Sequence, residues 1–170
     1  MDYDISPYLN LTPLNIKQAS VLLEAVELSR ESLETYLPWA ASVTDLDGAK
    51  KYISERLAMS DSRYFSIMYH HQFIGVFAIK SVEAPNTCEI GYWLCETARG
   101  NAIMDKVLRV MLPRLQEELA MRHIEFHCLD FNVASIKIAQ RAGAKLVRRY
   151  VVPMQDKLPK TMCIYTADLS

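Results

Sequence analysis

Apolar residues recur at helical spacing in two segments of the N-terminal third. Asn15 and Gln18 form a capping box ahead of the first segment, whose apolar positions are Ala19, Leu22, Leu23 and Val26. Thr44 and Asp47 form a second capping box, and the apolar positions after it are Leu46, Ala49, Ile53 and Leu57. These patterns predict two amphipathic helices, with a short helical turn over 31–37 that Pro38 ends.

Runs of β-branched and aromatic residues predict strands. An extended run over 9–14, flanked by Pro7 and containing Pro13, is typical of an edge strand. Two further runs, 64–69 and 73–82, are separated by a short polar turn at His70 and His71 and predict a hairpin. A third run over 87–94 completes an expected antiparallel meander.

The second half of the chain alternates helix and strand. A helix is expected over 101–120, with Pro113 kinking it or ending its first half, and a strand over 124–130. Strands joined by a helix in this way are parallel, with a right-handed crossover. Asn132 begins a further helix that ends at Gly143, and two final strands follow over 146–152 and 161–167. The predicted fold class is therefore α/β.

Composition and charge narrow the function classes. A chain of 170 residues fits one domain, 1–170, and its net charge of -1 lacks the basic field of a nonspecific nucleic-acid binder. No apolar stretch reaches the roughly 18 residues that a membrane span needs, so no membrane association is expected. The four cysteines lack zinc-site spacing, which favours a reduced, cytoplasmic location.

Two histidines, His123 and His127, are a candidate metal-binding pair. His123 and His127 would share one face of a helix, but on a strand their spacing separates them by about 13 Å, too far for one ion. We therefore expect no metal.

The most informative segment joins strand 87–94 to the following helix. Ligands of α/β sheets bind at the carboxyl ends of strands, and a helix N-terminus attracts phosphate groups. Arg99 and Gly100 stand just before that helix start, where glycine permits tight curvature and arginine adds a positive charge. Alone, this pattern is a weak signal.

Several motifs together resemble the GNAT N-acetyltransferase superfamily, and within it the branch that acetylates alanine or serine of ribosomal proteins. They are Leu37-Pro-Trp39, Glu89-Ile-Gly-Tyr-Trp-Leu94, Ala98-Arg-Gly-Asn-Ala-Ile-Met104, Asn132-Val-Ala-Ser135 and Arg141-Ala-Gly143. The resemblance implies a GNAT fold: a mixed, mostly antiparallel sheet with a splayed parallel pair, 87–94 and 124–130, flanked by helices. It also implies acetyl-CoA as donor and direct transfer to a primary amine.

The resemblance implies roles for single residues. Backbone amides of the phosphate loop would hold the diphosphate of acetyl-CoA, and the loop residues are Arg99, Gly100, Asn101, Ala102, Ile103 and Met104. The Leu94 amide would stabilise the oxyanion, Asn132 would bond the pantetheine arm, and Ser135 would protonate the thiolate. The tyrosine that is usual in the family as acid has no counterpart, because Ala139 stands there.

Two features leave alternatives open. Ala102 replaces a family glycine; alanine costs about 1–2 kcal/mol if its φ is positive, and is harmless if the position is helical. The base that removes the amine proton is Glu89, five residues before Leu94, or else Tyr165, His70 or Asp130.

The expected acceptor follows from the fraction of each kind of amine that is neutral at pH 7. At pH 7 an α-amine is roughly 14% neutral and a lysine amine about 0.04%, so a site without a strong base suits a protein N-terminus. Trp39 and Tyr165 are candidate substrate-binding residues. A basic run over 137–149 could bind the 3′-phosphate of CoA or an acidic protein such as a ribosomal protein. The alternatives are a silent acyl-CoA-binding or partner-binding module, and an acetyltransferase of a small amine or antibiotic.

Overall fold

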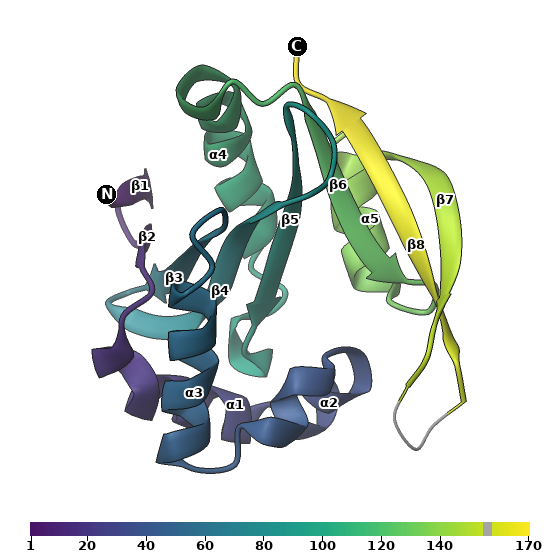
Figure 1. The fold of residues 1–170 in the computed structure, drawn as a ribbon. Coiled ribbons are helices and arrows are strands. Elements are labelled where there is room, and N and C mark those ends of the chain that lie inside the picture. Colours follow the sequence, from purple (N-terminus) through teal and green to yellow (C-terminus); the bar gives the residue numbers. More distant parts are fainter. Residues whose placement is uncertain (155–157) are drawn as a thin grey trace. The chain divides into compact units, whose positions relative to one another are not determined.

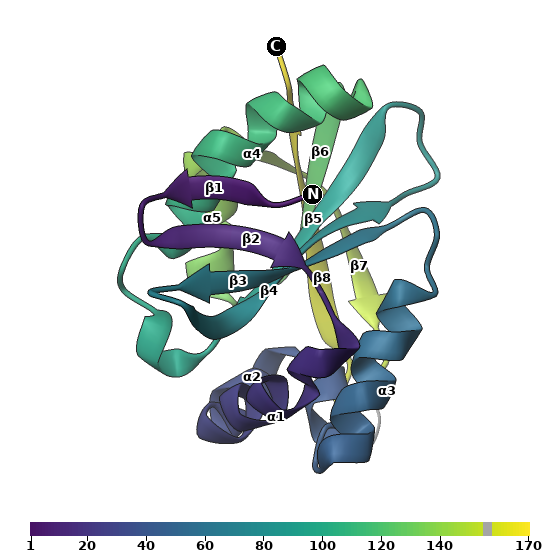
Figure 2. The ribbon, with the colours of Figure 1, turned by 90° about the vertical axis from the view of Figure 1, so that its left-hand side faces the viewer.

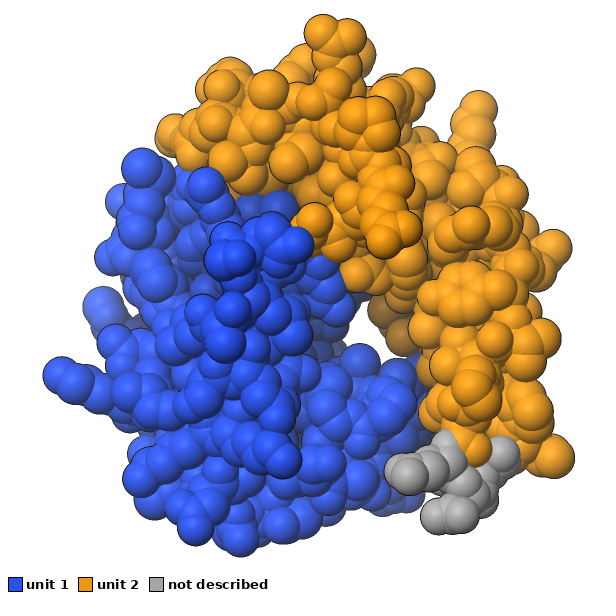
Figure 3. Space-filling model, viewed as in Figure 1, with its two compact units in different colours: residues 1–80, 92–103 blue, residues 81–91, 104–170 orange. Residues whose placement is uncertain are grey.

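A computed structural model describes residues 1–154 and 158–170 of the chain. The described residues divide into two compact units (Figure 3). Unit 1 contains residues 1–80 and 92–103, and unit 2 contains residues 81–91 and 104–170. The expectation of one domain over 1–170 stays a prediction.

Unit 1 contains an antiparallel sheet. Its strands run in the order β1 (Tyr3–Ser6), β2 (Leu9–Pro13), β3 (Arg63–Tyr69) and β4 (Gln72–Ser81). The prediction of an edge strand over 9–14 was wrong in one respect: β2 pairs on both sides, and the short β1 forms the edge. The hairpin turn is confirmed, with His70 and His71 at φ values of 48° and 65°, as the right-handed twist of a two-residue turn requires.

Three helices accompany these strands in unit 1 (Figure 2). They are α1 (Ala19–Leu28), α2 (Arg30–Tyr36) and α3 (Leu46–Leu57), with short 3-10 turns η1 (Ile16–Gln18) and η2 (Pro38–Ser42). The capping box of Asn15 and Gln18 is confirmed, ahead of η1.

The predicted start of α3 was wrong by one residue. Asp45, not Thr44, is the N-cap, and its carboxylate accepts a hydrogen bond of 2.7 Å from the Gly48 amide. Ala49 and Ile53 are buried as predicted, whereas Leu46 and Leu57 at the two ends are exposed. The helix therefore buries only its central turns.

Unit 2 contains the parallel pair (Figure 1). Strand β5 (Thr87–Leu94), whose last three residues belong to unit 1, pairs in parallel with β6 (His123–Leu129), and the order continues β8 (Lys160–Asp168), β7 (Lys145–Val152). Helix α4 (Ile103–Leu119) connects the parallel strands, and α5 (Val133–Arg141) packs against β6. The predicted α/β class with a mixed sheet is confirmed.

Two predicted details of the unit 2 helices had different outcomes. Pro113 lies inside α4, which continues through it to Leu119, so this proline does not end the first half of the helix. Gly143 follows α5 at a φ of 88°, as expected for a glycine that ends a helix. Within the described residues, no helix is long and apolar enough to cross a membrane.

Candidate active site

The carboxyl end of β5 is fixed by a close backbone approach within unit 1. A Cβ atom on Gly75 of β4 would lie 2.0 Å from the Trp93 carbonyl oxygen, which is too close for any side chain, so only glycine fits at this position. Two residues after Trp93, the Cys95 amide donates to the Ile74 carbonyl at 2.7 Å. The backbone around Leu94 is therefore held by the neighbouring strand.

The loop after β5 curves through two left-handed residues. A short turn, η3 (Glu96–Ala98), is followed by Gly100 at a φ of 82° and Ala102 at a φ of 53°. Of the two conformations considered for Ala102, helical or left-handed, the structure shows the left-handed one. Its positive φ costs alanine about 1–2 kcal/mol. A Cβ on Gly100 would meet no atom within 4 Å, so the loop faces open space there.

Hydrogen bonds brace this loop on its other side. The Asn101 side chain donates to the Ala98 carbonyl at 3.1 Å, and the Glu96 amide donates to the buried Ser29 hydroxyl at 2.7 Å. The first amides of α4, which begins at Ile103, have no partners within their own helix. A curved loop that ends in a helix N-terminus can hold an anionic group on its open side.

The Arg99 guanidinium is bound to the protein. It donates to the Leu94 carbonyl and to the Ser32 hydroxyl of α2, both at 3.0 Å. The side chain therefore ties the end of β5 to α2, while the expected contribution of the Arg99 backbone to the phosphate loop stays a prediction.

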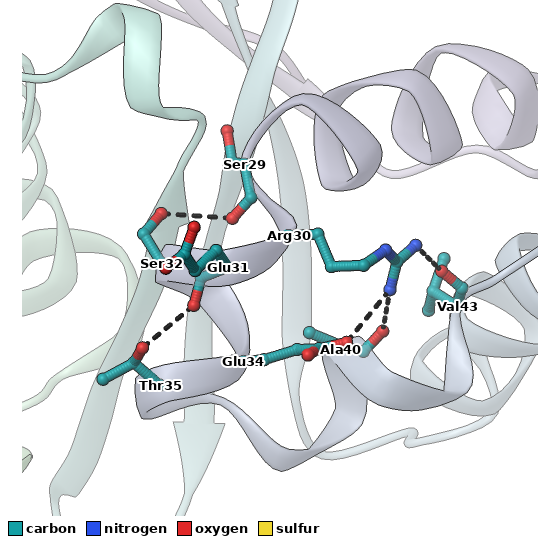
Figure 4. A network of polar contacts seen from close by, with 8 residues as sticks. All are labelled: Ser29, Arg30, Glu31, Ser32, Glu34, Thr35, Ala40 and Val43. Atoms are coloured by element: carbon teal, nitrogen blue, oxygen red, sulfur yellow. Dashed lines mark hydrogen bonds and ion pairs between the residues drawn. The ribbon is translucent and has the colours of Figure 1, made fainter.

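Arg30 organises the segment that carries Trp39 (Figure 4). Its guanidinium donates to the Ala40 carbonyl at 2.9 Å and the Val43 carbonyl at 2.6 Å, and it pairs with Glu34 at 3.3 Å. These contacts fix η2 against α2. These contacts are not predictable from local sequence, because an arginine on a helix gives no signal of the carbonyls that it meets.

Trp39 belongs to an aromatic cluster in unit 1. Its half-buried ring lies 4.6 Å from the Tyr52 ring and 5.4 Å from the Trp93 ring, measured between centroids. The Trp93 indole donates to the Tyr52 hydroxyl at 3.0 Å, and the Arg56 guanidinium lies 3.4 Å from the centre of the Tyr52 ring. Burial raises the pKa of Tyr52, and Arg56 partly offsets this. The substrate-binding role of Trp39 stays a prediction.

In unit 2, Asn132 and Ser135 meet at the start of α5. The Asn132 side chain accepts a hydrogen bond of 3.4 Å from the Ser135 amide, as an N-cap does. Both residues are half-buried. Their expected contacts with the pantetheine arm and the thiolate stay predictions.

The four candidate bases have different surroundings. Glu89 lies in a partly enclosed polar cluster, where a carboxylate oxygen is 3.1 Å from His127 Nδ1. Tyr165 is buried, at 8% exposed, in register with Phe126, and burial raises its pKa, so its phenol keeps its proton at neutral pH. His70 stacks on Tyr8 in the hairpin turn, and Asp130 is exposed after β6. Which of the four acts as the base stays a prediction.

The histidine pair of β6 does not form a metal centre. His123 pairs with Asp168 at 2.6 Å, away from the carboxylates that His127 contacts. In the part of the chain that the structure describes, no group of three His, Cys, Asp or Glu side chains could hold a metal ion.

A comparison with protein families decides the class of this fold. The acetyltransferase (GNAT) domain family matches residues 9–145, most of the chain. The chain belongs to the GNAT acetyltransferase family. The prediction from the β5 motif and the loop of 98–104 is thereby confirmed.

Relatives of this GNAT acetyltransferase include enzymes that modify ribosomal proteins. The ribosomal-protein-serine acetyltransferase of Escherichia coli (strain K12) is 24% identical over 143 residues, covering 82% of this chain and 80% of the relative. RimL, the ribosomal L7/L12 α-N-protein acetyltransferase in complex with coenzyme A, has a TM-score of 0.89 at 20% identity, covering 99% of this chain and 98% of RimL.

A second structural neighbour is a self-immunity acetyltransferase. The microcin C7 self-immunity acetyltransferase MccE, in complex with acetyl-CoA and AMP, also has a TM-score of 0.89, at 18% identity, covering 96% of this chain and 94% of MccE. At this identity both neighbours show the GNAT fold of this acetyltransferase and leave its acceptor open.

Proposed function

We propose that this acetyltransferase transfers the acetyl group of acetyl-CoA to the α-amine of a protein N-terminus. The observation that carries the proposal is the loop between β5 and α4, which turns through left-handed Gly100 and Ala102 and has open space beside Gly100. An anionic diphosphate suits such a loop. Structural neighbours with coenzyme A or acetyl-CoA bound support this choice of donor.

In this proposal, backbone groups hold the donor and side chains move protons. Amides of 99–104 hold the diphosphate, and the Leu94 amide stabilises the negative charge on the acyl oxygen. Asn132 bonds the pantetheine arm. As the amine nitrogen bonds to the acyl carbon, the C–S bond breaks, and the thiolate takes a proton from the Ser135 hydroxyl.

The choice of an α-amine rests on proton availability. Roughly 14% of an α-amine is neutral at pH 7, against about 0.04% of a lysine amine, so less help from a base is needed. The named targets of the E. coli relative and of RimL, which are ribosomal proteins, agree with this choice. Four unpaired thiols agree with a cytoplasmic setting.

An acidic ribosomal protein is the partner class that the basic run favours. Of its five cations, Arg141 is neutralised by Asp105, whose carboxylate oxygens lie 3.0 Å from the guanidinium. The other four are exposed, and they are Lys137, Lys145, Arg148 and Arg149. Three of the four lie on β7, so this strand would meet the acidic partner.

A small amine or antibiotic is the alternative acceptor. The fold leaves it open, because the TM-score of 0.89 with the microcin C7 self-immunity acetyltransferase MccE equals that with RimL. A screen of N-terminal peptides against small amines separates the two, because the acceptor class with the higher kcat/KM is the substrate class.

Two glycines offer a matched test of the donor site. Gly100 and Gly143 both have positive φ values, 82° and 88°, and a Cβ on either would meet no atom within 4 Å. Gly100→Ala and Gly143→Ala should therefore lose similar stability, about 1–2 kcal/mol. Only Gly100→Ala should weaken acetyl-CoA binding, by about tenfold or more, because its methyl group enters the space of the diphosphate.

Acetyl-CoA binding is read from thermal unfolding. At 100 times its Kd, acetyl-CoA should stabilise the wild-type chain by about 2.7 kcal/mol. Equal affinities of the two variants would place the donor elsewhere. No shift with the wild-type chain at millimolar acetyl-CoA would contradict both the enzyme and a silent acyl-CoA-binding module.

A further inference from the structure

Three ionisable side chains in unit 2 form a cluster that the roles above do not explain. His127 of β6 lies between two carboxylates: its Nδ1 atom is 3.1 Å from Glu89 of β5, and its Nε2 atom is 2.9 Å from Glu125 of β6. The side chains are mostly enclosed, with 20%, 17% and 19% of His127, Glu89 and Glu125 exposed. We call these three residues the Glu–His–Glu cluster.

Each ring nitrogen of His127 faces one carboxylate oxygen, and the contact with Glu125 is a hydrogen bond. An ionised carboxylate only accepts hydrogen bonds, so the doubly protonated ring is the form that suits both contacts. The positive charge of the ring then lies between two negative charges. Without it, two carboxylates on adjacent strands would repel each other.

The cluster lies where the parallel strands stop pairing. The register of β5 and β6 runs from Thr87 with His123 to its last pair, Glu89 with Glu125. His127 lies two residues beyond that pair, toward the carboxyl ends of both strands. Ligands of α/β sheets bind at that edge, so His127 is the member of the cluster nearest to it.

The neighbouring strands add few other charges. On β7, the pKa of Tyr150 is raised by burial and by the charges of Glu89 and Glu125, while the charge of Arg148 lowers it, so Tyr150 lies within reach of the two carboxylates. On β8, the register partners of Glu125 and His127 are the uncharged Thr166 and Ile164. His123, at the start of β6, and Asp168, at the end of β8, form a separate pair.

We propose that His127 is a positioning residue that holds Glu89 as the proton acceptor for the substrate amine, and that Glu125 holds the far side of the His127 ring. This rests on the proposed function. In the step, an N–H bond of the α-ammonium group breaks, and its proton passes to the carboxylate of Glu89 and then to water. The freed amine attacks the acyl carbon. Ser135 gives its hydroxyl proton to the departing thiolate, and the amine nitrogen gives a second proton to the Ser135 oxygen, which restores the hydroxyl. A base oriented by a third group is a common arrangement for nucleophile activation.

The test is the steady-state kinetics of an N-terminal peptide with acetyl-CoA at pH 7. His127→Gln should lower kcat by about tenfold or more. The KM for acetyl-CoA should stay within twofold. Glu89→Gln should lower kcat by about a hundredfold or more.

His123→Gln is the matched control, because His123 lies on the same strand and also pairs with a carboxylate. It should keep the wild-type kcat. An unchanged kcat in His127→Gln, or an equal loss in His123→Gln, would overturn the role of His127. A wild-type chain that acetylates no amine would instead contradict the proposed function.

A spectroscopic measurement tests the cluster if His127→Gln does not fold. The ring NMR signals of His127 should change in Glu89→Gln and in Glu125→Gln, because each carboxylate contacts one ring nitrogen. The ring signals of His123 should stay the same in both variants. Unchanged His127 signals in either variant would overturn the arrangement.

Discussion

Ala102 and Ala120 are both held at a φ of 53°, in a left-handed conformation that costs an L-residue about 1–2 kcal/mol. Replacing Ala102 by glycine relieves that cost. Glycine also raises the conformational entropy of the unfolded chain, which lowers the free energy of unfolding by about 0.4–1 kcal/mol. The net expectation for Ala102→Gly is a gain of about 0 to 1.6 kcal/mol in the free energy of unfolding, measured by urea denaturation.

Ala120→Gly is the control, because Ala120 follows α4 and is exposed, like Ala102. Both variants should gain similar stability, and only Ala102→Gly should change the affinity for acetyl-CoA. A loss of stability in Ala102→Gly would show that its conformation is not strained.

The loop residues could be predicted from the sequence, but their conformation could not. Alanine favours the helical region, so nothing local indicates a left-handed Ala102; the surrounding structure imposes it. The cluster of His127 with Glu89 has the same limit. Its partners lie on different strands, and only the register of β5 with β6 brings them together.

At the scale of elements, Arg30 is expected to hold η2 in place. Arg30→Met removes hydrogen bonds to the Ala40 and Val43 carbonyls, and bonds from a charged donor contribute about 1.5–3 kcal/mol each at most. The variant should lose about 2–3 kcal/mol of stability and exchange its amide protons over 38–43 faster, as measured by hydrogen–deuterium exchange.

Glu34→Gln separates the ion pair from the carbonyl contacts. It removes only the partly exposed pair with Arg30, which is expected to contribute about 0–1 kcal/mol. Exchange over 38–43 should therefore stay close to wild type. Equal effects of the two substitutions would contradict the role given to the carbonyl contacts.

Most elements were predictable because their patterns are local. The strand 87–94 is found at its predicted bounds, and the helix ended by Gly143 follows its capping residues. The four-residue β1 is too short to give a periodic signal. The insertion of β8 between β6 and β7 is a long-range pairing, which residue patterns do not encode.

For the whole molecule, buried thiols predict a loss of stability at alkaline pH. Burial raises the pKa of Cys88 to about 11 and that of Cys128 to about 12, above the value of 9.0 for an accessible thiol. The unfolded chain therefore releases these protons first as the pH rises. The stability is complete below about pH 9 and declines as the pH rises toward 11 and 12.

Urea unfolding between pH 7 and 11 measures this decline. Cys128→Ala should show a shallower dependence on pH than the wild-type chain, whatever its stability at pH 7. An unchanged slope would indicate that the Cys128 thiol ionises equally in the folded and unfolded chain.

The central claim is transfer to an α-amine, and mass spectrometry of one acetylated peptide tests it most directly. The peptide carries a free N-terminus and an internal lysine, and it is incubated with acetyl-CoA and the wild-type chain. We predict acetylation of the α-amine at least about tenfold faster than of the lysine. Equal modification of both amines, or of the lysine alone, would contradict the account.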